Sequence, residues 1–310
     1  MVKPKRTLGG ETRLTDRLRR LAVIPRGSAL VAGIGDDCAI FRPPRCPEDL
    51  LFTTDFLLED THFRRATHRA ADVGWKALAR GLSDIAAMGG EPRFCLVSLA
   101  LAPWCGAAWV DGFFQGLLRL ARREGAVLAG GDLSHAAIVA CDVVVCGALP
   151  RGAALGRDGA RAGDAIYVSG ALGGSALGMA EGRGKSWRRH LRPEPRLALG
   201  RFLRETVRAT ACMDLSDGLS LDLARLAKAS GLRAEITAPP IWPGATLAQA
   251  LHGGEDYELL FTVPPRAPVA RVFRGIPLTR IGLMTRRNPG EVILDGRPLA
   301  PDGYDHFRER

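Results

Sequence analysis

Acidic residues recur in short turns of this sequence, most of them directly after an apolar run. The acidic turns are Gly33-Ile34-Gly35-Asp36-Asp37, Thr53-Thr54-Asp55, Leu82-Ser83-Asp84, Gly130-Gly131-Asp132, Asp214-Leu215-Ser216-Asp217-Gly218 and Gly254-Glu255-Asp256. A single Asp in a turn is ordinary, because it caps a helix or closes an Asx-turn. Several that converge would repel one another, so their convergence requires a cation between them.

The available ligand types indicate which cation this would be. The candidates are carboxylate and hydroxyl oxygens, and the seven cysteines form no C-x-x-C pair, so Mg²⁺ is favoured over zinc. Magnesium is usually held by a few carboxylates together with substrate phosphates. The pattern therefore predicts phosphoryl or nucleotidyl transfer assisted by several Mg²⁺ ions, with charge neutralisation as the main catalytic contribution.

Two glycine-containing segments imitate known phosphate-binding loops. The segment from Gly182 to Ser186 resembles the end of a P-loop, but the motif needs glycine at the position of Met179. The segment Gly33-Ile34-Gly35-Asp36 lacks the third glycine of a dinucleotide fingerprint and carries acids where a phosphate would lie. If ATP binds, it binds by another arrangement.

Alternating apolar runs and helical patterns must position these turns. We predict buried strands over 50–55, 94–102, 138–149 and 165–169, and helices over 71–88, 110–124 and 219–230. A length of 310 residues suggests two domains with separate cores. The predicted architecture is two α+β domains that meet near residues 150–160.

The charge balance is basic, with 43 Lys and Arg against 33 Asp and Glu, a formal net charge of +10. Nearly all of the excess is arginine scattered along the chain, which argues against a nucleic-acid-binding stripe; the densest patch is 183–196. The longest uncharged stretch, 94–110, is too short to span a membrane, and the N-terminus lacks the apolar core of a signal peptide. We therefore expect a cytoplasmic protein that binds neither nucleic acid nor membrane, and keep an Arg-rich nucleic-acid-binding protein as an alternative.

Seven longer motifs resemble the thiamine-monophosphate kinase family and occur in its order along almost the whole chain. They are GIGDDCAI (33–40), TTDFLLEDTHF (53–63), GWKALARGLSDIAAMGGEP (74–92), GGD (130–132), MDLSDGL (213–219), GGEDYELLFT (253–262) and GYDHF (303–307). The wider superfamily is that of aminoimidazole ribonucleotide synthetase. The resemblance implies its two-domain α+β fold, with an N-terminal ATP- and Mg-binding, dimerising domain over 1–150 and a C-terminal α/β domain over 151–310 that completes the active site.

The resemblance also implies a reaction: direct transfer of phosphate from ATP to thiamine monophosphate, giving thiamine diphosphate, with several Mg²⁺ ions, no covalent protein nucleophile and a homodimeric enzyme. By motif, the metal ligands would be Asp36, Thr53, Thr54, Asp55, Asp84, Asp132, Asp214 and Asp217. Contacts to ATP would come from Gly131, Asp132, Arg157 and Ser216. Contacts to the thiamine substrate would come from His62, Glu255 and Tyr304.

Elementary chemistry agrees with two of these roles. An aromatic ring such as Tyr304 can stack on a cationic heterocycle, and Arg157 can fork onto phosphate oxygens. We expect Asp37 to support its turn rather than to bind a cation directly. The chain departs from the family pattern at Arg80-Gly81, where an Asn is common, and at Leu133-Ser134, where threonines are usual. A ligase-type ATP-dependent enzyme of the same superfamily stays open as the alternative.

Overall fold

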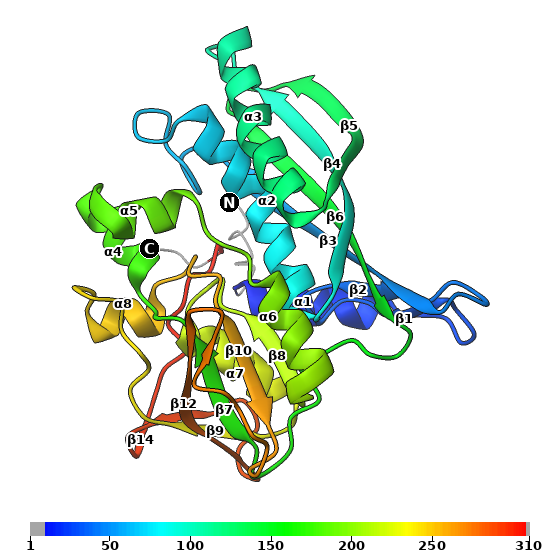
Figure 1. Ribbon diagram of the computed structural model, residues 1–310, viewed down its shortest axis with the longest axis vertical. Helices are drawn as coiled ribbons and strands as arrows, with labels where there is room; N and C mark the ends of the chain where they lie inside the picture. The colour runs from blue at the N-terminus through cyan, green and yellow to red at the C-terminus, as the bar shows by residue number, and fades with distance from the viewer. Residues whose placement is uncertain (1–9, 308–310) are drawn as a thin grey trace, which may run out of the picture.

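Two sheets and their flanking helices make up the computed structural model, which describes residues 10–307 (Figure 1). The first sheet is six-stranded, in the order β1-β2-β3-β6-β4-β5. Its strands are β1 (Leu30–Ala32), β2 (Ala39–Phe41), β3 (Glu48–Leu58), β4 (Glu91–Leu101), β5 (Val127–His135) and β6 (Ala140–Pro150). All neighbouring strands are antiparallel except β4 and β5, which are parallel.

Two long helices, α2 (Ala70–Ala87) and α3 (Ala107–Glu124), lie along one face of this sheet (Figure 1). The alternate residues Cys141, Val143 and Val145 of β6 are buried and contribute to the same apolar core as these helices. The helices approach each other backbone to backbone: a Cβ on Gly74 would lie 1.9 Å from the Phe113 carbonyl oxygen. Glycine is therefore required at this crossing.

The second sheet has eight strands, in the order β14-β13-β9-β12-β7-β10-β8, with β11 paired to β12. Its strands are β7 (Ala165–Ser169), β8 (Ala211–Asp214), β9 (Arg233–Ile236), β10 (Leu259–Val263), β11 (Val272–Phe273), β12 (Ile276–Thr285), β13 (Val292–Leu294) and β14 (Arg297–Pro298). The helices of this half are α4 (Gly174–Glu181), α5 (Gly184–Leu191), α6 (Leu197–Phe202) with the π-helix η1 (Leu203–Val207), α7 (Leu219–Ala229) and α8 (Leu247–His252). The remaining helix, α1 (Glu11–Leu21), precedes the first sheet.

The two halves share an apolar core across α2. The cluster that contains α2 continues into Leu199 of α6 and Phe261 of β10, and a Cβ on Gly200 would lie 1.9 Å from the Ala86 carbonyl oxygen. A second apolar cluster lies among α7, α8 and the second sheet. Because α2 is buried between the halves, any charged residue on it must face a partner or a cavity.

The predicted α+β architecture is confirmed, and the predicted strands and helices lie within a few residues of those observed. Strand β5 was not predicted. The expectation that every acidic motif forms a turn was wrong at three positions. Asp55 continues the β3–β6 ladder opposite Val143, Asp84 lies inside α2, and Asp132 lies inside β5. Asp84 stays helical because its carboxylate meets Thr53 across the core rather than its own backbone. No helix in residues 10–307 is long and apolar enough to cross a membrane.

Candidate active site

A cavity of about 1150 Å³ is lined by residues from both halves of the chain. Its walls come from α1, the turn before β2, strand β3, helix α2, the turn after β8, the 253–257 turn and the segment after β14. The residues predicted from sequence that line it are Asp36, Thr53, Thr54, Asp55, His62, Asp84, Arg157, Asp214, Ser216, Asp217, Glu255 and Tyr304. The structure therefore brings together twelve side chains that the sequence spreads over nearly 270 positions.

One end of the cavity is acidic, and we call Asp36, Asp37, Asp84 and Asp214 the acidic cluster. Carboxylate oxygens of Asp37, Asp84 and Asp214 all lie within 4.8 Å of one another, although these residues come from three separate elements. Thr53 Oγ1 donates a hydrogen bond to Asp84, and Ser83 Oγ donates one to Asp214 Oδ2 over 2.7 Å. Asp37 Oδ2 is buried without a hydrogen-bond partner in the described chain. These carboxylate oxygens cannot hydrogen-bond to one another when ionised, so their arrangement is suited to binding a cation.

The electrostatics of the acidic cluster also favour a cation. Burial, with the neighbouring carboxylates Asp214, Asp55 and Asp37 next in importance, raises the pKa of Asp84 well above its usual value. Burial and Asp37 act in the same direction on the pKa of Asp214. Burial and Asp37 raise the pKa of Asp36 to about 7. A hard divalent cation would relieve this repulsion, and carboxylate and hydroxyl oxygens suit Mg²⁺.

Arg157 compensates part of this charge. Its guanidinium pairs with Asp37, and its backbone N–H donates to Asp36 Oδ2 over 3.1 Å. The side chain is one-fifth exposed and lines the cavity, so it can also meet an anionic ligand. One arginine cannot neutralise four carboxylates. Within residues 10–307, neither Asp84 nor Asp214 forms an ion pair with a lysine or arginine.

The other end of the cavity is built on the Glu255 turn, residues 253–257. Lys76 Nζ lies 2.8 Å from Oε1 and 2.9 Å from Oε2 of Glu255, and His190 Nδ1 lies 3.3 Å from Oε2. Lys76 is fully buried. Burial alone would raise the pKa of Glu255, but Lys76, His190 and Arg80 outweigh it and lower this pKa to about 2. Glu255 is therefore ionised with its counter-charge already in place.

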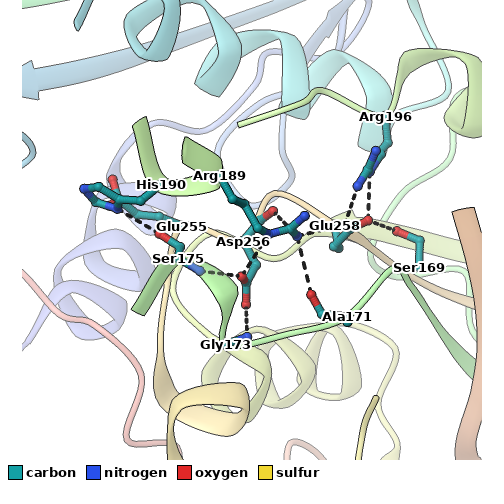
Figure 2. A network of polar contacts seen from close by, with 10 residues as sticks. All are labelled: Ser169, Ala171, Gly173, Ser175, Arg189, His190, Arg196, Glu255, Asp256 and Glu258. Carbon is teal, nitrogen blue, oxygen red and sulfur yellow. Dashed lines mark hydrogen bonds and ion pairs between the residues drawn. The ribbon is translucent and has the colours of Figure 1, made fainter. Parts of the chain in front are cut away.

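Figure 2 shows how the residues that follow Glu255 fix the turn. Asp256 accepts hydrogen bonds from the backbone N–H of Gly173 over 2.6 Å and of Ser175 over 3.2 Å, at the start of α4. Glu258 pairs with Arg189 and Arg196 and accepts a hydrogen bond from Ser169 Oγ. These bonds offset the cost of left-handed backbone at Glu255 (φ 63°) and Tyr257 (φ 50°).

Aromatic rings stand beside the Glu255 turn. The ring centroids of His62 and His306 are 5.2 Å apart, and those of Tyr304 and His306 are 4.8 Å apart. His62 Nδ1 accepts a hydrogen bond from the Leu58 N–H over 3.0 Å. Burial, with Arg80 second, lowers the pKa of His62 to about 3, so this ring is neutral at pH 7. The three residues predicted to contact thiamine, His62, Glu255 and Tyr304, therefore line one region of the cavity.

A third group of polar residues surrounds the start of α7. Asp217 pairs with Arg225, and its backbone N–H donates to Asp222 Oδ2 over 3.0 Å. Burial, followed by Asp217, raises the pKa of Asp222 to about 7. Helix α1 closes this side of the cavity, because the Glu11 N–H donates to both carboxylate oxygens of Asp305 at 3.1 Å.

Sequence reasoning missed Lys76, Arg80 and the position of Asp37 among the cavity carboxylates. Lys76, Arg80 and Asp84 are spaced by four residues within the helix predicted over 71–88, so they share one face of it. Charged residues at that spacing in an otherwise apolar helix were a signal that this face meets the site.

Gly131 and Asp132 lie outside the cavity of their own chain. They are exposed on β5, at the edge of the first sheet. The strand register separates them from Asp55, which lines the cavity, because Asp55 pairs with Val143, Val143 with Val97, and Val97 with Gly131. Strand spacing of about 4.8 Å puts Asp132 more than 10 Å from Asp55 along this path.

Comparison with known proteins defines the class first. Residues 35–149 match the family model of the N-terminal domain of AIR synthase related proteins, and residues 161–295 match that of their C-terminal domain. The thiamine-monophosphate kinases of Escherichia coli (strain K12) and Salmonella typhimurium are each 39% identical over 303 residues, covering 89% of this chain and 91% of the relative. The chain belongs to the thiamine-monophosphate kinase family of AIR synthase related proteins.

A solved structure supports this assignment. That of AaThiL complexed with AMPPCP and TMP superposes with a TM-score of 0.84 at 33% identity, covering 96% of this chain and 97% of the other. The likeness therefore extends over both halves of the molecule and over the cavity between them.

Proposed function

We propose that this protein transfers the γ-phosphoryl group of ATP to thiamine monophosphate and so forms thiamine diphosphate. The observation that carries the proposal is a single cavity in which Arg157 compensates only part of the charge of the acidic cluster, whereas the Glu255 carboxylate is already paired with Lys76. A nucleotide triphosphate brings metal ions to such carboxylates, whereas the aromatic rings beside the Glu255 turn suit a cationic organic substrate. The names of the relatives point to the same reaction.

The residues that would hold Mg²⁺ are those of the acidic cluster with Thr53, Thr54, Asp55 and Asp217 at its margins. When bound, Mg²⁺ would neutralise the negative charge of the phosphates and of the phosphoryl group in transfer. The protein contributes position: Thr53 and Ser83 fix the carboxylates of Asp84 and Asp214 by hydrogen bonds. Arg157 and Ser216, which line the same cavity, would contact the nucleotide phosphates. No side chain need form a covalent bond to phosphorus.

The opposite end would bind the thiamine moiety. The Glu255 carboxylate, held ionised by Lys76, would face the positive charge of the thiazolium ring. Tyr304 and His62 offer aromatic faces to a cationic heterocycle. With thiamine at this end and ATP at the acidic cluster, the acceptor phosphate comes to lie between the two, in line with the donor.

We further propose that the enzyme is a homodimer that pairs through the edge strand β5. Eight of the nine residues of this strand are exposed, among them Val127 and Leu133, which are 62% and 61% exposed. A nine-residue edge strand that exposes large apolar side chains is uncommon in a monomer, because it offers unpaired backbone groups to another chain. A second copy seated here would cover Gly131 and Asp132, giving a reason for their position outside the cavity. A cytoplasmic location, where ATP is available, belongs to the same proposal.

The test is an assay of purified protein with ATP and thiamine monophosphate, with and without Mg²⁺. Formation of thiamine diphosphate only when Mg²⁺ is present supports the proposal. ATP hydrolysis without thiamine diphosphate would point instead to a ligase-type member of the superfamily. Affinity for DNA or RNA in the absence of Mg²⁺, falling steeply with salt, would indicate the nucleic-acid-binding alternative.

A further inference from the structure

Arg80 places a fixed cation in the middle of the cavity. Its Nε and Nη2 lie 3.2 and 2.7 Å from the same oxygen of Asp55, and its side chain is 11% exposed. Asp55 belongs to the motif predicted to bind Mg²⁺. In this chain the Arg80 guanidinium already supplies a positive charge to that carboxylate. Arg80 and Gly81 together form one of the two places where the sequence departs from the pattern that the resemblance implies.

The neighbouring departure has a different explanation. Gly81 faces the first sheet, where an added Cβ would lie 2.7 Å from Cγ2 of Val145. Gly81 therefore adjusts the packing of α2 on β6, and the change that alters the cavity is at Arg80 alone.

The guanidinium has hydrogen-bonding capacity to spare. Both hydrogen bonds of Arg80 reach Asp55 Oδ1, and Nη1 has no acceptor within residues 10–307. A buried ion pair of this kind holds its planar group rigidly, so the unused donors have a defined direction. A forked donor of fixed orientation in a cavity is suited to phosphate oxygens.

Arg80 lies between the two ends of the cavity. On α2 it is one turn after Lys76, which pairs with Glu255, and one turn before Asp84 of the acidic cluster. Under the proposed function, this is the region where the acceptor phosphate of thiamine monophosphate meets the phosphoryl group of ATP.

We propose that Arg80 binds the acceptor phosphate of thiamine monophosphate and, as a built-in cation beside Asp55, reduces the affinity of the nucleotide-free protein for divalent cations. The first part rests on the proposed function, whereas the second requires no thiamine compound. Arg80 thus makes the chain select the phosphorylated substrate over free thiamine.

The first experiment titrates the nucleotide-free protein with Mn²⁺ and measures free Mn²⁺ by electron paramagnetic resonance. Arg80→Met should bind Mn²⁺ about tenfold more tightly than wild type, because it removes a positive charge near the carboxylates and frees Asp55. Arg80→Lys should stay within about threefold of wild type, because it keeps the charge. Unchanged affinity in Arg80→Met would overturn the built-in-cation part.

The second experiment measures binding of thiamine monophosphate and of free thiamine by calorimetry. Loss of a charge-assisted contact should weaken thiamine monophosphate binding to Arg80→Met by about 10- to 100-fold, and leave free thiamine within about twofold. An equal loss for both ligands, or no loss, would overturn the phosphate-binding part.

The matched control is Arg42→Met. Arg42 pairs with Asp49, and its Nε lies 2.7 Å from Asp49 Oδ1. Asp49 belongs to β3, as Asp55 does, but neither Arg42 nor Asp49 lines the cavity. Arg42→Met should leave both the Mn²⁺ affinity and the ratio of the two thiamine affinities unchanged; a shift like that of Arg80→Met would overturn the inference. The wild-type assay for thiamine diphosphate tests the proposed function separately. A kinase in which Arg80 has no effect on binding can therefore be distinguished from a protein that is not a kinase.

Discussion

The two ends of the cavity treat buried carboxylates in opposite ways. In the acidic cluster, burial and mutual repulsion raise the pKa values of Asp84 and Asp214, and Asp37 Oδ2 has no partner in the described chain. At the Glu255 turn, Lys76 and its neighbours lower the pKa of a partly exposed carboxyl to about 2. The charge of a carboxylate is therefore only partly compensated by the chain at the acidic cluster and is compensated by Lys76 at the Glu255 turn.

This contrast shows where charge compensation is fixed and where it is variable. A cation supplied by the chain holds a site ready for a ligand at all times. A site that lacks its cation stays dependent on what the nucleotide brings, so its occupancy can follow the reaction. Arg80 lies between the two ends and is a cation supplied by the chain, paired with Asp55.

The largest effect should come from removing a carboxylate at the acidic end. Asp84→Asn should lower kcat on the order of 10³-fold, since positioned charge stabilisation of the transition state is lost. Without divalent cations the same variant should be at least as stable as wild type, because burial and the neighbouring carboxylates already disfavour an ionised carboxyl at this position, and asparagine is neutral. Steady-state kinetics and thermal unfolding in a chelator measure the two quantities. Marked destabilisation of the metal-free variant would contradict the account of this end.

Removing the counter-charge at the Glu255 turn should instead lower the stability of the folded protein. Lys76→Met leaves Glu255, whose side chain is only 21% exposed, without its main counter-charge and should lower the free energy of unfolding by about 3 kcal/mol. Urea denaturation measures this change. The double variant Lys76→Met/Glu255→Gln should recover most of it, whereas Lys185→Met, at an exposed lysine of α5, should have no effect. If the double variant recovered nothing, the ion pair would not be the cause.

The pH dependence of cation binding should separate the two ends further. Asp36, with a pKa of about 7, and Asp84 and Asp214, with raised pKa values, retain protons in the folded metal-free protein that a bound cation must displace. Mn²⁺ affinity should therefore rise with pH between about 5.5 and 7.5, by up to about tenfold per pH unit for each proton released. Glu255, ionised above pH 2, should not contribute, so Glu255→Gln should show the same slope. A flat profile in wild type would refute the raised pKa values.

The smallest effects should come from two matched serines. Ser83→Ala removes the hydrogen bond to Asp214, and Ser175→Ala removes the one between Ser175 Oγ and His190 Nδ1, which is 2.9 Å long. Each should cost about 1 kcal/mol of stability. Only Ser83→Ala should also weaken Mn²⁺ binding, by a few-fold, because only this serine orients a carboxylate of the acidic cluster. Equal Mn²⁺ affinities in the two variants would contradict the assignment of cation binding to the acidic cluster.

The sequence allowed much of the fold and the acidic character of the site to be predicted. Apolar runs and glycine stops placed the main strands and helices, because burial of those runs against a second layer leaves few alternatives. The helix predicted over 71–88 contains Asp84, although the acidic pattern treated this residue as part of a turn, and the contact with Thr53 was not predicted, since a local pattern cannot show that a distant strand satisfies its carboxylate. Strand β5 escaped prediction for a related reason: its residues are mostly exposed and carry no buried alternation.

The roles of Lys76 and Arg80 could not be read from the sequence for a physical reason. A buried lysine is stable only with a counter-charge, and that counter-charge, Glu255, lies 179 residues further along the chain. Asp132 shows the same limit from the other side, because its motif predicts a metal ligand while its own chain leaves it outside the cavity. Its role as a ligand stays a prediction.

The bond between Glu11 and Asp305 joins segments 294 positions apart and lies at the rim of the cavity. During synthesis, the amino-terminal helix leaves the ribosome early but meets its anchor only after Asp305 has emerged. Domains generally fold as they are made, so the halves can pack before this clasp exists. The rim of the cavity can thus be completed only after residue 305 has been synthesised.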